Sequence, residues 1–251
     1  MGKSTVSANL ALAVAAQGHK VGLLDADIYG PSQGMMLGVA SGTRPEVRND
    51  LMMPIEAHGL QCMSMSFVTD ERTATVWRGP MASGALTQLI SQTRWDDVDY
   101  LIVDMPPGTG DIQLTLAQQV PLAGAVIVTT PQDIALLDAC KGIEMFRKVE
   151  VPVLGIVENM SMHVCSNCGH EEPIFGAGGG ERIAAEYETT LLGRLPLSLA
   201  IREQSDGGRP PLISEPDGEA SRIFKEIAVK VVEAVENAGS RGGPKIRIVD
   251  D

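Results

Sequence analysis

The sequence predicts an α/β fold in which a mostly parallel sheet is covered by helices on both faces. Three observations lead to this prediction. Apolar runs of strand length alternate with longer helical segments, two of these runs end in a carboxylate, and turns rich in Gly and Pro follow the same two runs. A length of 251 residues fits one large domain, which we place at residues 1–238, with a flexible Gly-, Arg- and Lys-rich tail at 239–251.

The elements can be placed in order from apolar patterns and from the turn residues that bound them. In the first half we expect a helix at 6–18, a buried strand at 20–25, a hairpin or two edge strands at 51–55 and 60–65, a helix that starts at Gly79-Pro80 and runs to about residue 93, and a central strand at 99–104. In the second half we expect strands at 124–128, 153–157 and 191–195, helices at 134–148, 181–188 and 216–237, and a Pro-rich loop before the closing helix.

Composition excludes several classes of protein. With 44% hydrophobic and 21% charged residues the chain is typical of a soluble globular protein, and its net charge of -12 argues against broad binding to nucleic acid or anionic membranes. No run approaches the roughly 20 apolar residues that span a bilayer, and we expect no signal peptide. Four cysteines, of which only two lie close together, do not form a disulfide framework, so we expect a reducing cytoplasm.

The first residues carry the back half of a phosphate-binding loop. In Met1-Gly2-Lys3-Ser4-Thr5 the backbone N–H groups and the following helix N-terminus would face phosphates, with Lys3 on the β- and γ-phosphates and Ser4 on Mg²⁺. Thr5 would donate to a neighbouring phosphate and cap the helix. A chance turn with a solvated lysine is the alternative reading of this short string.

Acidic residues follow the two predicted strands that would flank a bound nucleotide. Asp104 has the context of the carboxylate that orients the water shell of Mg²⁺, and Asp25 and Asp27 could hold an attacking water or the metal shell. Gly108 and Gly110 would offer backbone N–H groups in a segment that senses the γ-phosphate. Each aspartate alone can equally be a strand-end or capping residue, but their order together predicts a phosphate-binding site.

A second candidate site is the Cys165-Ser166-Asn167-Cys168 stretch, whose spacing lets both thiolates hold one metal centre. A complete centre usually needs four ligands, and Cys62 and Cys140 lie in apolar contexts typical of buried, inert thiols. We therefore expect a centre shared by two chains, with Cys165 and Cys168 from each.

Three other readings of the cysteine pair stay open. A thioredoxin-type dithiol would stand at a helix start, whereas Gly169 and Pro173 indicate a loop. A zinc site within one chain could use His163 and His170, although the spacing is cramped and solvated histidines are the simpler expectation. A surface pair without ligand is the last alternative.

The chain resembles the Mrp/ApbC branch of the deviant-Walker-A P-loop ATPases, iron-sulfur cluster carriers of the MinD/ParA-like superfamily, over nearly its whole length. The matching stretches are GKSTVSANLALA, GLLDADIYGPS, VWRGPM, DYLIVDMPPGTGD, VENMSMHVCSNCGH and IFGAGGGERIA. The resemblance implies Lys3, Ser4 and Thr5 for phosphate and Mg²⁺, Asp25 and Asp27 for a first switch and Asp104 and Gly110 for a second. It also implies that Asn159 recognises the adenine edge, with Pro196 nearby, and that a bridging [4Fe-4S] cluster is held between two chains.

Family members carry a loop of the form KGGVGKST, and Met1 stands where this loop has Val. We therefore expect the chain to be clipped inside the loop, with the first strand and the signature lysine missing. The resemblance implies a slow ATP hydrolase that acts as a homodimer and passes its cluster from scaffold proteins to apo-proteins, without nucleic acid or membrane partners.

Two other functions are alternatives to this prediction. A positioning ATPase of the MinD/ParA type would need a basic amphipathic helix or patch, which residues 241–251 do not offer. A metal-binding scaffold that no longer binds nucleotide is the other. Among smaller features, we expect Trp77 and Arg78 to pack near the switch regions, and Met160, Met162 and the Pro106-Pro107 pair could line a docking surface.

Overall fold

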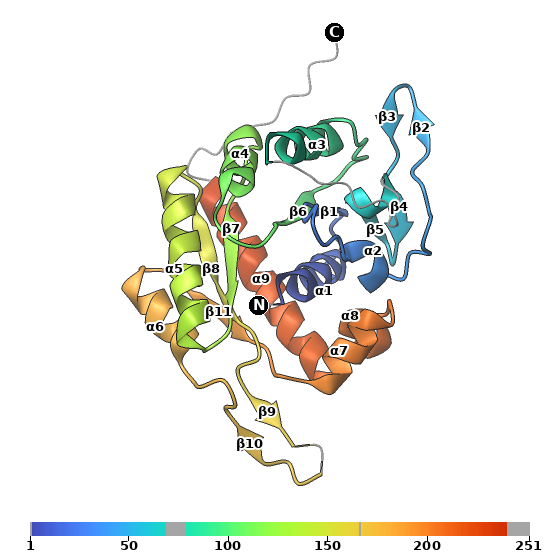
Figure 1. Ribbon diagram of the computed structural model, residues 1–251. Coiled ribbons are helices and arrows are strands. Elements are labelled where there is room, and N and C mark those ends of the chain that lie inside the picture. The colour runs from blue at the N-terminus through green and yellow to red at the C-terminus, as the bar shows by residue number, and fades with distance from the viewer. Residues whose placement is uncertain (1, 69–78, 166, 240–251) are drawn as a thin grey trace.

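The computed structural model describes residues 2–68, 79–165 and 167–239. Strands and helices alternate along the chain as expected (Figure 1). The elements of the first half are α1 (Lys3–Ala15), β1 (Val21–Asp25), α2 (Gln33–Met36), β2 (Val47–Arg48), β3 (Leu51–Met52), β4 (Ile55–Ala57), β5 (Leu60–Ser64), the 3-10 helix η1 (Met65–Phe67), α3 (Gly79–Ser91), β6 (Tyr100–Asp104) and α4 (Asp111–Gln119). Those of the second half are β7 (Ala125–Thr129), α5 (Asp133–Lys148), β8 (Val153–Glu158), β9 (His163–Val164), β10 (Glu171–Glu172), α6 (Gly179–Glu186), β11 (Leu191–Arg194), α7 (Leu199–Asp206), α8 (Pro211–Ser214) and α9 (Glu219–Gly239).

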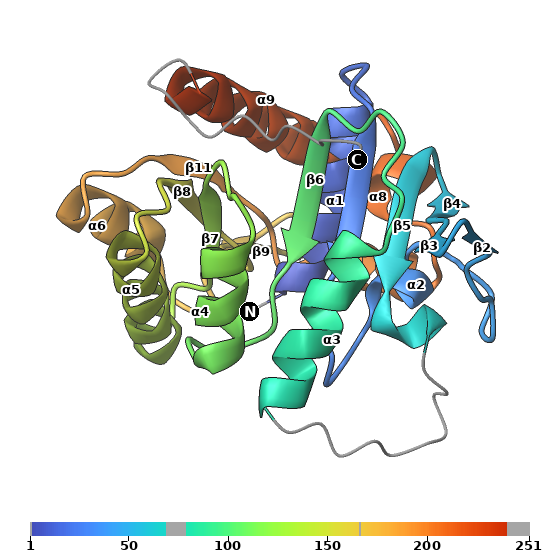
Figure 2. The same ribbon diagram turned by 90° about the horizontal axis from the view of Figure 1, so that it is seen from above.

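The central sheet is mostly parallel, which confirms the predicted fold class. It consists of a four-stranded part in the order β4-β5-β1-β6 and a three-stranded part in the order β11-β8-β7, and β4 alone among these strands pairs antiparallel. Figure 2 shows the two parts side by side, with β6 and β7 facing each other. Within the described ranges no strand pairs with the facing edges of β6 and β7, so the sheet is divided there.

Two strand predictions are corrected by this order. The strand predicted as central at 99–104 is β6, which forms an edge of the four-stranded part because no described strand lies between it and β7. The segment predicted as hairpin or edge at 60–65 is β5, which lies inside the sheet between β4 and β1. The burial of β5 agrees with this interior position: four of its five residues are buried, and only Gln61 is partly exposed.

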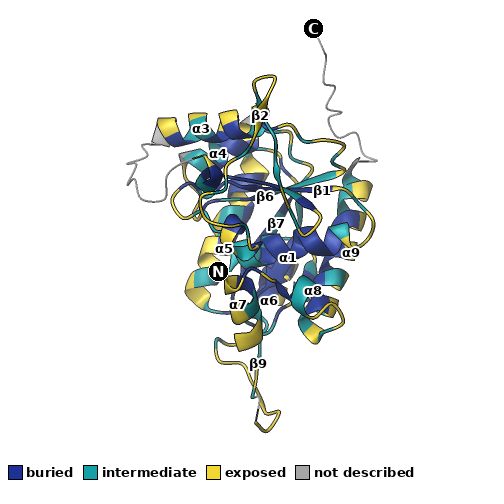
Figure 3. Cartoon of the chain, turned by 90° about the vertical axis from the view of Figure 1, so that its right-hand side faces the viewer, coloured by how far each residue is buried: buried dark blue, intermediate teal, exposed yellow. Residues whose placement is uncertain are grey.

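Helices cover both faces of the sheet. α1 packs on β1 and β6 and against α9, which extends along β8 and β11, while α5 and α6 pack on β7 and β8 from the other side (Figure 2). After its first residues α1 is mostly buried (Figure 3), and its alanines at positions 8, 11 and 13 let it lie close to the sheet and to α9. The first helix is therefore fixed firmly, which matters because the phosphate-binding residues stand at its start.

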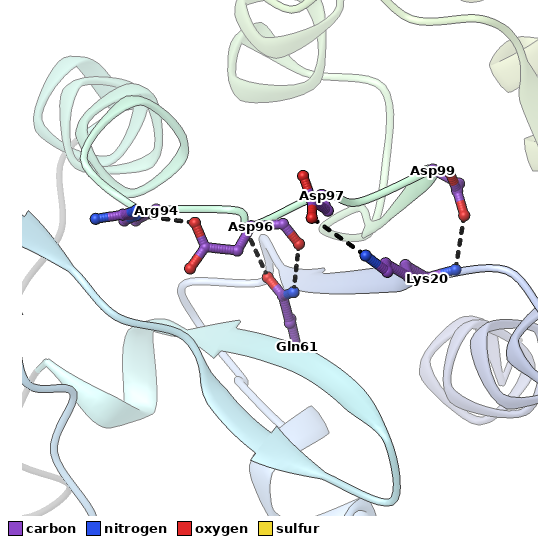
Figure 4. A network of polar contacts seen from close by, with 6 residues as sticks. All are labelled: Lys20, Gln61, Arg94, Asp96, Asp97 and Asp99. Atoms are coloured by element: carbon purple, nitrogen blue, oxygen red, sulfur yellow. Dashed lines mark hydrogen bonds and ion pairs between the residues drawn. The ribbon is translucent and has the colours of Figure 1, made fainter.

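A polar network ties the amino ends of the sheet strands together (Figure 4). The backbone N–H of Lys20 donates to the carboxylate of Asp99 at 2.8 Å, and the Lys20 ammonium pairs with Asp97 at 3.2 Å. Gln61 donates to the carbonyl of Asp96 at 2.7 Å and accepts from its N–H at 3.1 Å. These contacts fix β1, β5 and the segment that enters β6 in mutual register, at the edge opposite to the predicted nucleotide site.

Several boundaries differ from prediction. α1 begins at Lys3 rather than residue 6, and the Pro-rich loop before the closing helix contains α7 and α8, since a proline such as Pro211 is tolerated at the start of a helix. α9 reaches Gly239, so the expected tail starts one residue later and residues 240–251 lie outside the described residues, as do Trp77 and Arg78. In the part of the chain that the structure covers, no helix is both long enough and apolar enough to cross a membrane.

Candidate functional site

The candidate nucleotide site lies at the carboxyl edge of the sheet. β1 and β6 pair in a register that places Asp25 directly beside Asp104 at their ends. Since the carboxyl ends of parallel strands meet at one edge, the two predicted acidic residues come together with the start of α1. Both carboxylates are almost completely buried.

The start of α1 is open toward this edge. Gly2 adopts a left-handed conformation with φ of 76°, and no described side chain caps the helix. The first backbone hydrogen bond of the helix runs from Val6 N–H to Gly2 O at 3.1 Å, which leaves the N–H groups of Lys3, Ser4 and Thr5 without an intrahelical acceptor. Three N–H donors and a helix N-terminus are what a phosphate group needs.

The prediction that Thr5 caps this helix is wrong. Thr5 lies inside the first turn, and its carbonyl accepts from the side chain of Asn9 at 2.9 Å. The helix can begin earlier because the left-handed glycine turns the chain at position 2.

Asp104 is held by donors from two elements. The Ser7 hydroxyl of α1 donates to its Oδ1 at 3.0 Å, and the side-chain amide of Gln33 in α2 donates to its Oδ2 at 2.8 Å. Burial raises the pKa of the Asp104 carboxyl, while hydrogen bonds from Gln33, Ser4 and Ser7 and the nearby charge of Lys3 lower it. Lys3 and Ser4 therefore stand beside the carboxylate that the sequence assigned to the metal shell.

Asp25 organises the loop between β1 and α2. Its Oδ2 accepts from the N–H groups of Ser32 at 2.8 Å and Gln33 at 3.0 Å and from the Ser64 hydroxyl at 3.1 Å, and its Oδ1 accepts from Asp27 N–H at 3.2 Å. Burial is the main reason why the pKa of Asp25 rises to about 6, and the charge of Asp104 adds to it. The carboxylate is thus surrounded by three donors from its own loop and one from the end of β5.

Asp27 lies farther out on the same loop and is partly exposed. Its Oδ1 accepts from the N–H groups of Tyr29 at 3.2 Å and Gly30 at 3.3 Å, which is a local turn contact. Its other carboxylate oxygen accepts no hydrogen bond in any contact found between described residues. Asp25 is buried, whereas Asp27 is partly exposed. Of the two aspartates after β1, Asp27 is therefore the one whose carboxylate can reach a ligand from its present position.

The loop after β6 supplies the glycines that the sequence singled out. Gly108 has a φ of 92°, a conformation that side-chain-bearing residues rarely adopt, and Gly110 precedes the first turn of α4 as its N-cap. The buried side chain of Gln113 donates to the carbonyl of Pro107 at 2.6 Å and so holds this turn against α4. The backbone at Gly108 and Gly110 follows directly from the strand that ends in Asp104.

Asn159 and Pro196 are brought together by β8 and β11. The N–H of Asn159 donates to Thr129 O at 2.7 Å, and Leu195, which precedes Pro196, donates its N–H to Glu158 O at 2.9 Å. The Asn159 side chain also lies against the start of α1, since a Cβ added to Gly2 would be 2.3 Å from its Nδ2. The predicted base-binding residue is thus adjacent to the predicted phosphate-binding loop.

The cysteine pair stands on a hairpin formed by β9 and β10, which projects from the body of the molecule and is largely exposed (Figure 3). Cys165 is partly exposed and Cys168 exposed. The N–H groups of Asn167 and Cys168 and the Cys168 thiol all lower the pKa of the Cys165 thiol. The deprotonated form that binds metals is therefore favoured at Cys165.

The other cysteines and the nearby histidine differ in how far they are buried. Cys62 is buried as predicted, but Cys140 is only partly buried, because it lies at the rim between α5 and Tyr187. His163 is also partly buried, and its Nδ1 lies 3.3 Å from Leu197 O. Among the described residues, no three His, Cys, Asp or Glu side chains gather where they could hold a metal ion.

Three polar side chains of this region were not identified from the sequence. Gln33 and Ser7 contact Asp104, and the buried Glu158 accepts from the N–H of Gly180 at 2.6 Å and pairs with Arg194 at 3.5 Å. Glu158 could have been suspected from its place at the end of a predicted strand. Gln33 and Ser7 carry no local signal, because their role depends on contacts between distant segments.

Comparison with known proteins identifies relatives over nearly the whole chain. The sequence profile of the ParA family, described as NUBPL iron-transfer P-loop NTPase, matches residues 1–232. An iron-sulfur cluster carrier protein of Pseudomonas fragi is 64% identical over 91% of this chain and 80% of its own length. The corresponding protein of Escherichia coli is 58% identical over 92% of this chain, which spans only 63% of that relative. The iron-sulfur cluster transfer protein NUBPL of Mus musculus is 49% identical over 95% of this chain and 75% of its own length.

Solved structures agree with these relatives. A nucleotide-binding protein of Archaeoglobus fulgidus in complex with ADP has a TM-score of 0.76 at 35% identity, and the match covers 89% of this chain and 86% of that one. The cell division ATPase MinD of Pyrococcus furiosus has a TM-score of 0.69 at 23% identity, with 92% and 93% covered, and shows the shared fold.

Proposed function

Because this chain belongs to the ParA family of NUBPL-type iron-transfer P-loop NTPases, we propose that it is an ATP-dependent carrier of iron-sulfur clusters. Two copies would hold one [4Fe-4S] cluster as cargo between their cysteine hairpins and release it to apo-proteins. Cluster scaffold proteins would supply the cargo, and the four free thiols would be kept reduced in a compartment such as the cytoplasm.

The observation that carries this proposal is the pair of adjacent thiols on the projecting hairpin. Cys165 and Cys168 provide two thiolate ligands at an exposed position, and the Cys165 pKa is lowered toward the form that binds iron. A cubane cluster takes about four thiolates. The two remaining ligands would come from the same hairpin of a second chain, which makes a homodimer part of the proposal.

The residues at the carboxyl edge fit a Mg²⁺-nucleotide. The free N–H groups at the start of α1 and the Lys3 ammonium would hold the phosphates, and the Ser4 hydroxyl would bind the metal, with Asp104 beside it. Asn159 would bind the adenine edge, with Pro196 beside it. Magnesium, when bound, would offset the phosphate charge and polarise the terminal phosphate. A Cβ at Gly2 would crowd this cradle, which fits the glycine found there.

Hydrolysis is proposed to be slow. The Asp25 carboxylate, one candidate for holding an attacking water, already accepts from four donors of its own surroundings. The partly exposed Asp27 would have to take this role from a loop position. Gly108 and Gly110 would sense the terminal phosphate through their backbone N–H groups.

Iron and sulfide reconstitution of the full chain tests the cargo site. We expect about one [4Fe-4S] cluster per dimer, measured by iron and acid-labile sulfide and by the absorbance of the cluster. Cys165→Ala combined with Cys168→Ala should abolish it, whereas Cys140→Ala is the matched control at a partly buried thiol outside the hairpin. Unchanged cluster content in the double variant would refute the ligand assignment.

Calorimetry with Mg-ATP tests the nucleotide site independently. Heat of binding that is lost in Lys3→Ala supports the carrier, and the absence of binding in the wild-type chain would instead favour a metal scaffold without nucleotide. ATP-dependent co-sedimentation with liposomes or DNA would favour a positioning ATPase.

A further inference from the structure

The side chain of Gln33 occupies a buried position between the parts of the candidate nucleotide site. It is fully buried, and it stands in the first turn of α2, directly after the loop that follows β1. Neither the sequence patterns nor the family resemblance assigns it a role. Its contacts, however, reach three separate segments of the site.

The side-chain amide of Gln33 joins the phosphate-binding helix to the second strand end. Its Nε2 donates to Ser4 O at 3.0 Å and to Asp104 Oδ2 at 2.8 Å. Both partners are acceptors, so the nitrogen of the amide must face them and the orientation of the group is fixed. The bond to the carboxylate is charge-assisted and stronger than one between neutral groups.

The backbone of the same residue is bound to the first strand end. The N–H of Gln33 donates to Asp25 Oδ2 at 3.0 Å. One residue therefore connects the end of β1, the end of β6 and the first turn of α1. These hydrogen bonds connect the loop between β1 and α2 directly to Asp104.

The oxygen of the Gln33 amide has no hydrogen-bond partner within the described part of the chain. An acceptor buried without a donor costs free energy, and such a group in a folded protein calls for an explanation such as a bound water or ion. This oxygen is also closed to solvent, so no water reaches it, and its cost is offset by the two hydrogen bonds that the nitrogen of the same amide donates.

The turn that carries Gln33 is also held by contacts with η1 and β5. The next residue, Gly34, packs so closely on η1 that a Cβ there would lie 2.7 Å from the ring of Phe67. The Ser64 hydroxyl at the end of β5 donates to Asp25 at 3.1 Å, which fixes the same turn from the neighbouring strand. The Gln33 amide is thus held at a fixed place rather than free to swing away.

We propose that Gln33 is a positioning residue for the magnesium ion of the bound nucleotide: it holds Asp104 against the start of α1, where this carboxylate would orient the metal's water shell. This inference rests on the proposed nucleotide site and deepens it. The residue acts through Asp104, so its loss should weaken the effect of magnesium more than the binding of the nucleotide itself.

Fluorescence titration of the full chain with mant-ADP, in Mg²⁺ and in EDTA, tests the proposal. Gln33→Met keeps the size and burial of the side chain but removes the donors, and Gln33→Leu is the second variant if the first is unfolded by circular dichroism. We expect the Mg²⁺-dependent tightening of mant-ADP to fall by about tenfold, equivalent to about 1.4 kcal/mol, with little change in the affinity measured in EDTA.

Gln61→Met is the matched control. Gln61 also makes two side-chain hydrogen bonds, both to Asp96, but at the opposite edge of the sheet (Figure 4). This variant should lose thermal stability without a change in the magnesium effect. If the folded Gln33 variants keep the full magnesium effect, or lose affinity equally in Mg²⁺ and EDTA, the positioning role is refuted. If the wild-type chain itself binds no mant-ADP, the proposed nucleotide site fails and the role of Gln33 with it.

Discussion

Burial of the ionised Asp25 should make the protein less stable at neutral pH than the isosteric variant Asp25→Asn. The carboxyl group is completely buried at the end of β1, and burial raises its pKa from 3.8 to about 6. The nearby charge of Asp104 acts in the same direction, and the N–H groups of Gln33, Ser32 and Asp27 oppose it. Asparagine removes the charge without changing the shape of the side chain.

The magnitude follows from the difference between the folded and unfolded pKa. A shift of about 2 units corresponds to about 3 kcal/mol, since each unit is worth about 1.36 kcal/mol. The folded pKa is the higher one, so the penalty is absent below the unfolded pKa and grows as the pH rises from about 4 to about 6, above which it is complete. The amide of asparagine cannot accept from Asp27 N–H where Oδ1 now does, at 3.2 Å, which costs about 1 kcal/mol at every pH.

When the burial penalty and the lost hydrogen bond are combined, Asp25→Asn and the wild type should have the same free energy of unfolding at about pH 4.5. At about pH 7.5 the free energy of unfolding of the variant should be higher by about 2 kcal/mol. Urea unfolding followed by circular dichroism at both pH values measures this difference. Asp27→Asn removes the same charge from a partly exposed position of the same loop and is the control for net charge. A difference between Asp25→Asn and wild type that does not change with pH would refute the reasoning.

Three further predictions concern the phosphate loop, a glycine contact and the start of α6. Lys3→Ala should weaken mant-ATP binding by at least about tenfold because a charge-assisted contact to phosphate is lost, and unchanged affinity in a fluorescence titration would contradict that role. Gly38→Ala should lower the free energy of unfolding, measured by urea denaturation, by about 1–3 kcal/mol more than Gly59→Ala does, since both glycines have positive φ but only a Cβ at Gly38 meets backbone, the Gly208 oxygen at 2.8 Å. Glu158→Ala should cost about 2 kcal/mol in the same assay because a first-turn N–H of α6 loses its buried acceptor, and a neutral result would argue against that contact.

The sequence was sufficient to predict which residues meet at the carboxyl edge. The apolar runs before Asp25 and Asp104 are long enough to form buried strands, and parallel pairing then brings both carboxylates to one edge in matching register. The Gly-Lys-Ser-Thr string likewise placed the start of α1 there. These predictions succeed because they depend on local patterns and on one rule of sheet geometry.

Contacts between distant segments could not be predicted in this way. The segment at 60–65 looks like an edge strand in isolation, and only its pairing with β1 shows that it lies inside the sheet as β5. Gln33 stands in a short helix after a Gly-Pro turn, where a polar residue would ordinarily be solvated. Its burial arises from the approach of α1 and β6, which no pattern within its own segment encodes.

The segment 159–180 carries the cysteine hairpin, and both of its ends are anchored near the candidate nucleotide site. Asn159 lies against Gly2 at one end of the segment, and at the other end Gly180 donates to Glu158, the residue before Asn159. The hairpin therefore leaves and returns at the end of β8, next to the contact between Asn159 and Gly2. A ligand that displaces the Asn159 side chain from Gly2 would move one end of the segment 159–180, while the other end stays bound to Glu158 through Gly180. We therefore expect the hairpin to change its orientation and the sheet to stay in place. This is a physical basis on which the proposed nucleotide binding could alter how firmly two hairpins would hold the proposed shared cluster.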